Sequence, residues 1–147
     1  MVDEWDQWDL MVTNRQPGYI TGDRTGIDLE TYHQDLATVS GQANLAQALL
    51  NRLHTRRGEL AALGHPEYGS RLYQLLGGLN NPRMRLLAEL YIRECLAQEP
   101  RISTVVEVRF DPLSRDRERH ALRAVITVHP QGDRSPLSFN WSLYLGE

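Results

Sequence analysis

Residues 81–110, with the sequence NPRMRLLAELYIRECLAQEPRISTVVEVRF, contain the transition on which the fold prediction depends. Up to Ala97 the apolar residues recur with a helical period. After Glu99-Pro100 they alternate with a period of two, which is typical of a strand with one buried face. Because proline cannot continue a helix, Pro100 is expected to force a sharp corner between the two elements.

The helix is predicted from Arg83 to about Ala97, with Asn81 as its cap and Pro82 at its first position. Apolar residues occupy two of its sides, so we expect it to be buried on more than one face. One side carries Met84, Leu87, Ala88, Tyr91 and Cys95, and the other carries Leu86, Leu90 and Ala97. The one polar line has a spacing of four and is expected to form surface ion pairs between Arg85, Glu89 and Arg93.

Three alternating stretches predict a three-stranded antiparallel meander. The residues expected on one face of the first strand are Ile102, Thr104, Val106, Val108 and Phe110. Those of the second are His120, Leu122, Ala124, Ile126 and Val128, and those of the third are Leu137, Phe139, Trp141, Leu143 and Leu145. A charged loop, Asp111 to Arg119, separates the first two strands, and a turn at Pro130 to Asp133 separates the last two.

Two further helices are expected upstream, at about Gln42 to Arg57 and at Ser70 to Leu76, after a weak strand candidate at Leu36 to Val39. The apolar stripe of the first helix consists of Leu45, Ala46, Leu49, Leu50 and Leu53. The predicted fold class is α+β, three helices followed by the meander, with the helices covering the apolar face of the sheet. Residues 27–147 are expected to form a single domain.

Residues 1–26 are predicted to form an N-terminal arm, because they show neither a helical nor an alternating apolar period. The arm carries Trp5 and Trp8, with four acidic residues among its first ten positions. Two interpretations stay open: the tryptophans cap the core of their own domain, or they bind a neighbouring subunit. The first ten residues lack the features of a signal peptide, so export by that route is not expected.

The composition excludes several functional classes. The chain has 147 residues, a net charge of −3 and 41% hydrophobic residues, and no stretch is apolar enough to cross a bilayer. All sixteen basic residues are arginine and are scattered, which argues against nucleic-acid binding. Codon usage explains an arginine-only chain, and so does the suitability of arginine for protein interfaces. The single cysteine, Cys95, cannot form an internal disulfide, as is usual in a reducing compartment.

No catalytic constellation or cofactor site is predicted. The sequence has no glycine-rich phosphate motif and no nucleophile elbow. Its histidines lack the spacing of metal ligands, so no metal site is expected either. Cys95 is expected to pack as a small apolar residue. The alternative weighed here is a peptidoglycan-cleaving, lysozyme-like enzyme, which requires two suitably separated carboxylates. Its candidate acids are Glu59, Glu67, Glu94 and Glu99.

Four motifs carry a resemblance when they are taken in order. They are NLAQAL at 44–49, LHTRRGE at 53–59, PEYGSRL at 66–72 and EPRI at 99–102, where a helix gives way to a strand. This series resembles the phage baseplate wedge family formerly called lysozyme-like, which has counterparts in type VI secretion systems and extracellular contractile injection systems. The resemblance runs from about Asp35 to Val108, half of the chain.

The resemblance implies a structural subunit that is not an enzyme, located where the baseplate wedge meets the first sheath ring. It also implies a fold like the sheath subunit's interlocking domain, several copies in a symmetric baseplate, and assembly in the bacterial cytoplasm. Expected partners are other wedge proteins and sheath subunits that exchange strands, with Leu137 to Leu145 as a candidate edge. No nucleic-acid or membrane partner is expected.

The residues expected to bind partners include the corner Glu99, Pro100 and Arg101, which the resemblance implies is a junction with the helical core bundle of the wedge. The others are Tyr68, Arg71, Trp5 and Trp8. An arginine held at the corner can donate two parallel hydrogen bonds to the carboxylate of a partner. The alternative is an internal contact between Glu99 and Arg101 that only fixes the corner.

Overall fold

The computed structural model describes residues 9–10, 12–14, 27–29, 31–32, 35–36, 38–39, 41–112, 119–132 and 134–146. The chain divides into two compact units, Met1–Ala48 and Leu49–Glu147. The described part of the first unit contains short strands in three antiparallel pairs. These pairs are β1 (Asp9–Leu10) with β6 (Thr38–Val39), β2 (Val12–Asn14) with β3 (Ile27–Leu29), and β4 (Thr31–Tyr32) with β5 (Asp35–Leu36). Parts of the predicted arm therefore pair with residues beyond position 26, and the domain boundary at that position stays a prediction.

Helix α1 (Gly41–His54) follows the predicted apolar stripe. Three leucines of the stripe are buried, namely Leu45, Leu49 and Leu53. The polar residue Gln47 is buried as well, and burial lowers the pKa of His54. The helix ends earlier than predicted because Arg56 forms a parallel bridge with Ser70.

Helix α2 (Pro82–Leu96) begins as predicted, since the Asn81 side chain accepts a hydrogen bond from the backbone N–H of Met84 at 2.9 Å. Its buried residues are Ala88, Ile92, Cys95 and Leu96. The expectation of burial on a second face is wrong, because Leu86 is 70% exposed and Leu90 and Ala97 are exposed too. These three residues lie opposite the buried face, where nothing in the described chain covers them.

The polar line of α2 forms only in part. Arg93 pairs with Glu89 at 2.9 Å, as its spacing predicts. Arg85 turns away from the helix and donates to the Asn80 side chain and to the carbonyl of Asp111.

Between α1 and α2 the described chain forms two short 3₁₀ helices, η2 (Ala61–Leu63) and η3 (Leu72–Leu75). The second of them lies within the short helix predicted at Ser70 to Leu76. Hydrogen bonds from the Ser70 hydroxyl and N–H to the end of α1 hold that residue outside a helix. The predicted three helices are therefore two α-helices in the described part of the chain. The α+β class is confirmed.

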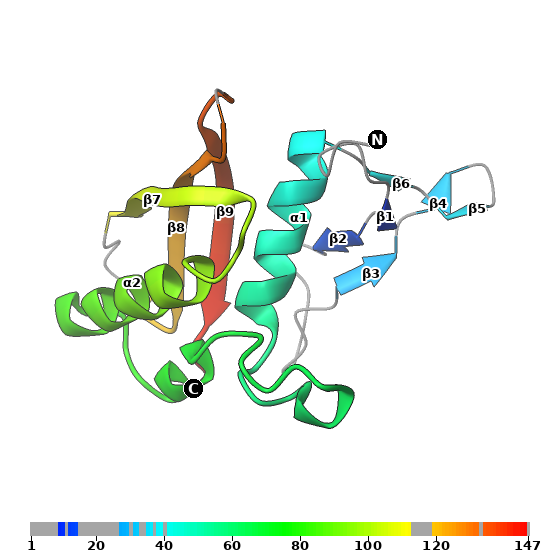
Figure 1. Ribbon diagram of the computed structural model, residues 1–147. Helices are drawn as coiled ribbons and strands as arrows, with labels where there is room; N and C mark the ends of the chain where they lie inside the picture. The colour runs from blue at the N-terminus through cyan, green and yellow to red at the C-terminus, as the bar shows by residue number, and fades with distance from the viewer. Residues whose placement is uncertain are drawn as a thin grey trace. The chain divides into compact units, whose positions relative to one another are not determined.

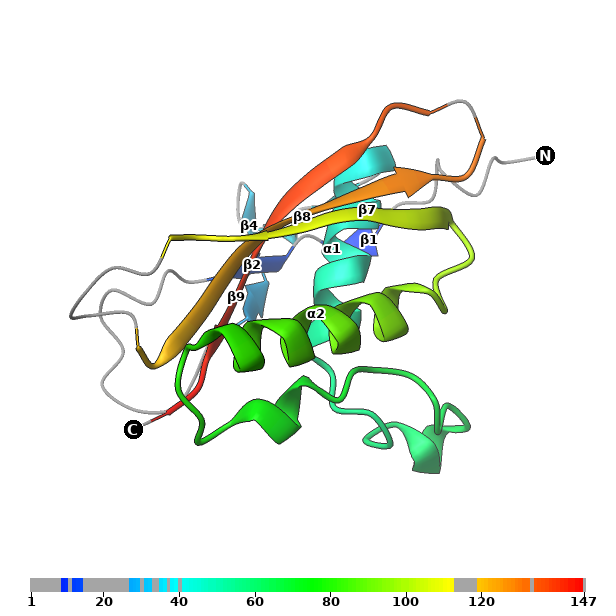
Figure 2. The ribbon, with the colours of Figure 1, turned by 90° about the vertical axis from the view of Figure 1, so that its left-hand side faces the viewer.

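The sheet is the predicted antiparallel meander, with strand order β7-β8-β9 (Figure 1). The strands are β7 (Ile102–Phe110), β8 (Ala121–Pro130) and β9 (Leu137–Tyr144). The pairing of β8 with β9 is regular along its whole length. Its buried side chains include Leu122, Ala124, Ile126, Val128, Phe139 and Trp141. Both ribbon views show α2 lying along the sheet beside β7 (Figure 2).

Strand β7 departs from the predicted alternation. Register shifts occur between Ile102 and Thr104 and between Val105 and Glu107. Each shift adds one residue to β7 and reverses the side to which the following side chains point. As a result Val105 is buried and Val106 is exposed, the opposite of the sequence-based expectation.

No helix in the described part of the chain is long and apolar enough to cross a membrane.

Candidate functional site

The predicted corner lies between α2 and β7 and is held by hydrogen bonds on both sides. The helix ends at Leu96, and the N–H of Glu99 donates to the Leu96 carbonyl at 3.1 Å. Pro100 follows and is exposed, and β7 begins two residues later. On the other side the N–H of Gln131 donates to the carbonyl of Arg101 at 2.9 Å. The corner is therefore tied to the turn between β8 and β9.

Glu99 points inward at this corner and is only 6% exposed. One of its oxygens accepts hydrogen bonds from Nε of Arg101 at 2.8 Å and from the Arg101 backbone N–H at 3.3 Å. The other accepts from a terminal nitrogen of Arg52 on α1 at 3.3 Å. Burial alone would raise the pKa of Glu99, but the hydrogen bonds and charge of Arg101, with the charge of Arg52, outweigh it and lower that pKa. Glu99 is therefore a carboxylate at neutral pH, and it orients two arginines.

Tyr68 belongs to the same cluster. The guanidinium of Arg52 stacks over its ring, 4.4 Å from the ring centre. Burial raises the pKa of Tyr68, with smaller opposing contributions from Arg52 and others. The predicted residues Glu99, Arg101 and Tyr68 thus lie together, joined by Arg52, which the sequence reasoning missed.

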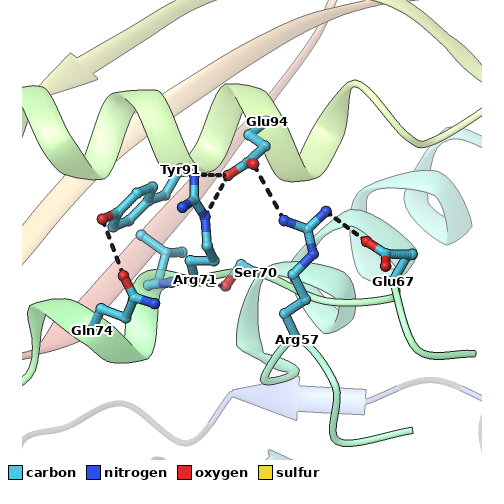
Figure 3. A network of polar contacts seen from close by, with 8 residues as sticks. Arg57, Glu67, Ser70, Arg71, Gln74, Tyr91 and Glu94 are labelled. Atoms are coloured by element: carbon cyan, nitrogen blue, oxygen red, sulfur yellow. Dashed lines mark hydrogen bonds and ion pairs between the residues drawn. The ribbon is translucent and has the colours of Figure 1, made fainter. Parts of the chain in front are cut away.

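Arg71 belongs to a second cluster, shown in Figure 3. It donates to one oxygen of Glu94 through Nε at 2.8 Å and through a terminal nitrogen at 2.7 Å. Its guanidinium also lies over the ring of Tyr91 at 4.7 Å. Arg57 bridges the other Glu94 oxygen, at 3.2 Å, and Glu67, at 3.1 Å. The hydrogen bond from Arg71 lowers the pKa of Glu94 most, burial opposes it, and Arg57 adds to the lowering.

The internal alternative for the corner is thus present, since Glu99 binds Arg101 directly. Only Nε and the backbone N–H of Arg101 take part in that contact. Within the described chain no group accepts a hydrogen bond from the two terminal nitrogens of Arg101. A guanidinium carries five N–H donors, so Arg101 keeps donors for an external acceptor while Glu99 fixes its orientation.

The four candidate acids of a lysozyme-like site are all engaged. Glu94 and Glu99 have lowered pKa values, whereas the general acid of a glycosidase needs a raised one. Glu67 pairs with Arg57, and Glu59 accepts a hydrogen bond from the Arg56 N–H at 3.1 Å. Three of these acids, Glu67, Glu94 and Glu99, form ion pairs that hold the fold.

The remaining candidates are placed as follows. Cys95 is buried and its pKa is raised to about 12 by burial, so its thiol is unreactive. The described residues hold no group of three or more His, Cys, Asp or Glu side chains suited to a metal ion. Trp5, Trp8 and most of the loop Asp111 to Arg119 lie outside the described residues.

Comparisons with known proteins point to one family. The family model for the contractile injection system sheath initiator matches residues 20–129. Among solved structures, one similar chain comes from Geobacter sulfurreducens and is provisionally named a tail lysozyme. It has 24% sequence identity and a TM-score of 0.58, with 71% of this chain and 90% of that chain covered, which supports the fold. A comparison with curated proteins found no match. Because the family model matches more than half of this chain, the chain belongs to the family of contractile injection system sheath initiators.

Proposed function

We propose that this chain is the baseplate wedge subunit that links the wedge core bundle to the first sheath ring and starts sheath assembly there. The family model supports a structural, sheath-initiating role at the baseplate. The observation that carries the finer proposal is the regular outer edge of β9, opposite a protected edge on β7. In this proposal several copies enter a symmetric baseplate that assembles in the bacterial cytoplasm.

The outer edge of β9 is suited to receive a strand. The N–H of Leu145 donates to the carbonyl of His120 on the β8 side. Since the two edges of a strand alternate, the N–H groups of Ser138, Asn140 and Ser142 point away from β8. The register of β9 against β8 is regular over all three of these positions. Just beyond the end of β9, the N–H of Gly77 donates to the Leu145 carbonyl.

The edge of β7 is protected in two ways. Its two register shifts interrupt the even spacing that an added strand requires. In addition, Arg93 donates to the carbonyl of Val105 at 2.8 Å. A hollow of about 260 Å³ beside this edge is lined by side chains from both elements, so the end of α2 flanks the strand: Arg93, Ala97, Ile102, Ser103, Thr104 and Val105. A strand from the sheath is therefore expected at β9, and this choice agrees with the edge proposed from the sequence.

An Asn140→Pro substitution tests strand addition. Proline removes one outward N–H and places its ring on the free edge, while the bonds between β8 and β9 remain. In cells that produce the particle, we expect baseplates that incorporate the variant but carry no sheath, as seen by negative-stain electron microscopy. Asn140→Ala keeps the N–H and is the matched control, with normal sheaths expected. Normal sheaths on Asn140→Pro baseplates would contradict strand addition at β9.

The corner is proposed to bind the core bundle through Arg101, whose guanidinium donates hydrogen bonds to a carboxylate of the bundle. Arg101→Ala removes the free guanidinium donors and leaves Glu99 with Arg52. We expect a folded monomer that is less stable by about 1.5–3 kcal/mol, the usual worth of a lost charged hydrogen bond. Copurification with the other wedge proteins should fall about tenfold, since tenfold corresponds to roughly 1.4 kcal/mol. Circular dichroism checks the fold, and unchanged copurification would remove the corner from the interface.

The other predicted partner-binding residues have two different roles in this proposal, one for Trp5 and Trp8 and another for Tyr68 and Arg71. The two tryptophans are proposed to bind an adjacent baseplate subunit. The internal contacts of Tyr68 and Arg71 favour an indirect contribution, in which they hold the partner-binding surface in shape.

A further inference from the structure

Residues 57–69, called here the 57–69 loop, are closed at their base by backbone hydrogen bonds. The N–H of Arg57 donates to the Ser70 carbonyl at 3.0 Å, and the N–H of Ser70 donates to the Thr55 carbonyl at 2.9 Å. The Ser70 hydroxyl adds a bond to the carbonyl of Leu53 at 2.7 Å. The two ends of the loop are therefore fixed against the end of α1.

Ion pairs fix the loop from a second side. Arg57, at its start, pairs with Glu67, near its end, and with Glu94 on α2 (Figure 3). Glu94 is held in turn by Arg71, just beyond the loop. The side chains thus cross-link both stems of the loop to a helix.

The tip of the loop has its own hydrogen bonds. The N–H groups of Ala61, Leu63, Gly64 and His65 bond to carbonyls within the loop at 3.0–3.1 Å. Gly64 has a φ of +87°, which lets the chain turn back after η2. The conformation of the tip is therefore fixed locally, and binding would cost little conformational entropy.

This ordered tip exposes apolar side chains. No residue of η2 is buried, and Leu63 is 73% exposed. Ala61 and Ala62 beside it are exposed as well. Single exposed leucines are common on protein surfaces. An apolar tip on a loop that is held by three sets of bonds is a different case, because compact loops of this kind frequently carry function.

We propose that the 57–69 loop inserts Leu63 into a leucine-sized apolar recess with a basic rim on a different subunit of the baseplate. The charge of the loop indicates the basic rim: the acids Glu59 and Glu67 flank the tip and are exposed, and no arginine lies between them. Acidic flanks also oppose insertion into an anionic lipid surface. The inference rests on the proposed baseplate role, and it adds a docking element separate from the corner and the β9 edge.

Leu63→Glu tests the docking element in cells that assemble the native particle. Leu63 makes no buried contact, so the purified variant should keep its melting temperature within about 2 °C. Its incorporation into particles, measured by quantitative immunoblotting of purified particles, is expected to fall at least about tenfold, as for an interface anchor. Leu79→Glu is the matched control, since Leu79 is 51% exposed outside the loop, and it should incorporate normally.

A photo-crosslinking residue at position 63 identifies the occupant. We expect a crosslink in particles to a baseplate protein other than this chain. Normal incorporation of Leu63→Glu, equal losses for both glutamate variants, or a crosslink between two copies of this chain would each overturn the proposal. A strain that lacks the whole chain separates this failure from failure of the proposed function: normal sheaths there would refute the function itself.

Discussion

A Gly69→Ala chain is expected to lose about 3–4 kcal/mol of unfolding free energy, from backbone strain and overpacking together. Gly69 has a φ of +107°, a region that residues with a Cβ rarely adopt. An added Cβ would lie 2.6 Å from the carbonyl oxygen of Thr55 and 2.9 Å from backbone atoms of Arg56 and Arg57. Backbone atoms cannot move aside as a flexible side chain can. Urea unfolding followed by circular dichroism measures the loss as a lower midpoint at unchanged slope.

Gly58→Ala is the control for Gly69→Ala, because it lies in the same loop and has a similar positive φ of +89°. Nothing lies within 4 Å of its Cβ position, so it should cost only the strain of the left-handed conformation, about 1–2 kcal/mol. Equal losses for the two variants would show that the close approach of Gly69 to the end of α1 does not matter. The difference between them therefore measures the crowding at the base of the 57–69 loop.

The elements predicted best are those in which local signals and tertiary packing agree. Helix α2 has its cap, its first-turn proline and a corner proline, and its bounds differ by one residue from those expected. The regular pairing of β8 with β9 follows the alternation of apolar residues. Strand β7 shows the limit of this reasoning. Its valines at 105 and 106 are equally apolar, so the sequence cannot reveal the bulge that decides which of them is buried.

The corner was predicted from local sequence, but its chemistry was not. A contact between Glu99 and Arg101, which are two positions apart, was one of the two alternatives predicted for the corner. The second arginine, Arg52, is 47 positions away, and only the packing of α1 against the end of α2 brings it to Glu99. The arginine-only composition was a partial signal for such arginine contacts. Arginines inside the chain donate to a carboxylate through two nitrogens or stack on aromatic rings, contacts that lysine makes less well.

Glu99→Gln is expected to lower the free energy of unfolding by about 2–3 kcal/mol at pH 7, because it leaves donors facing donors in a nearly buried site. The two carboxylate oxygens accept from Arg101 and Arg52. An amide offers one oxygen and one NH2 group, so one arginine then faces N–H donors. Glu67→Gln is the matched control, since its exposed carboxylate pairs with Arg57 alone and should contribute less than about 1 kcal/mol. Urea unfolding of all three proteins measures both losses.

The pH dependence of the stability difference between the natural chain and Glu99→Gln distinguishes a loss of charge from a change in packing. The pKa of Glu99 is lowered in the folded chain, from an ordinary value of 4.5. Its contribution is therefore complete above that ordinary value and is lost as the pH falls through the lowered folded pKa. The gap in stability between the natural chain and Glu99→Gln should then be constant from pH 7 to about 5 and shrink below about 4. Glu94 titrates in the same direction in both proteins and cancels from the difference. If the difference in stability between the two proteins stayed constant down to pH 2, the effect would come from altered packing at the corner. The charge of the Glu99 carboxylate would then contribute nothing to its contacts with the two arginines.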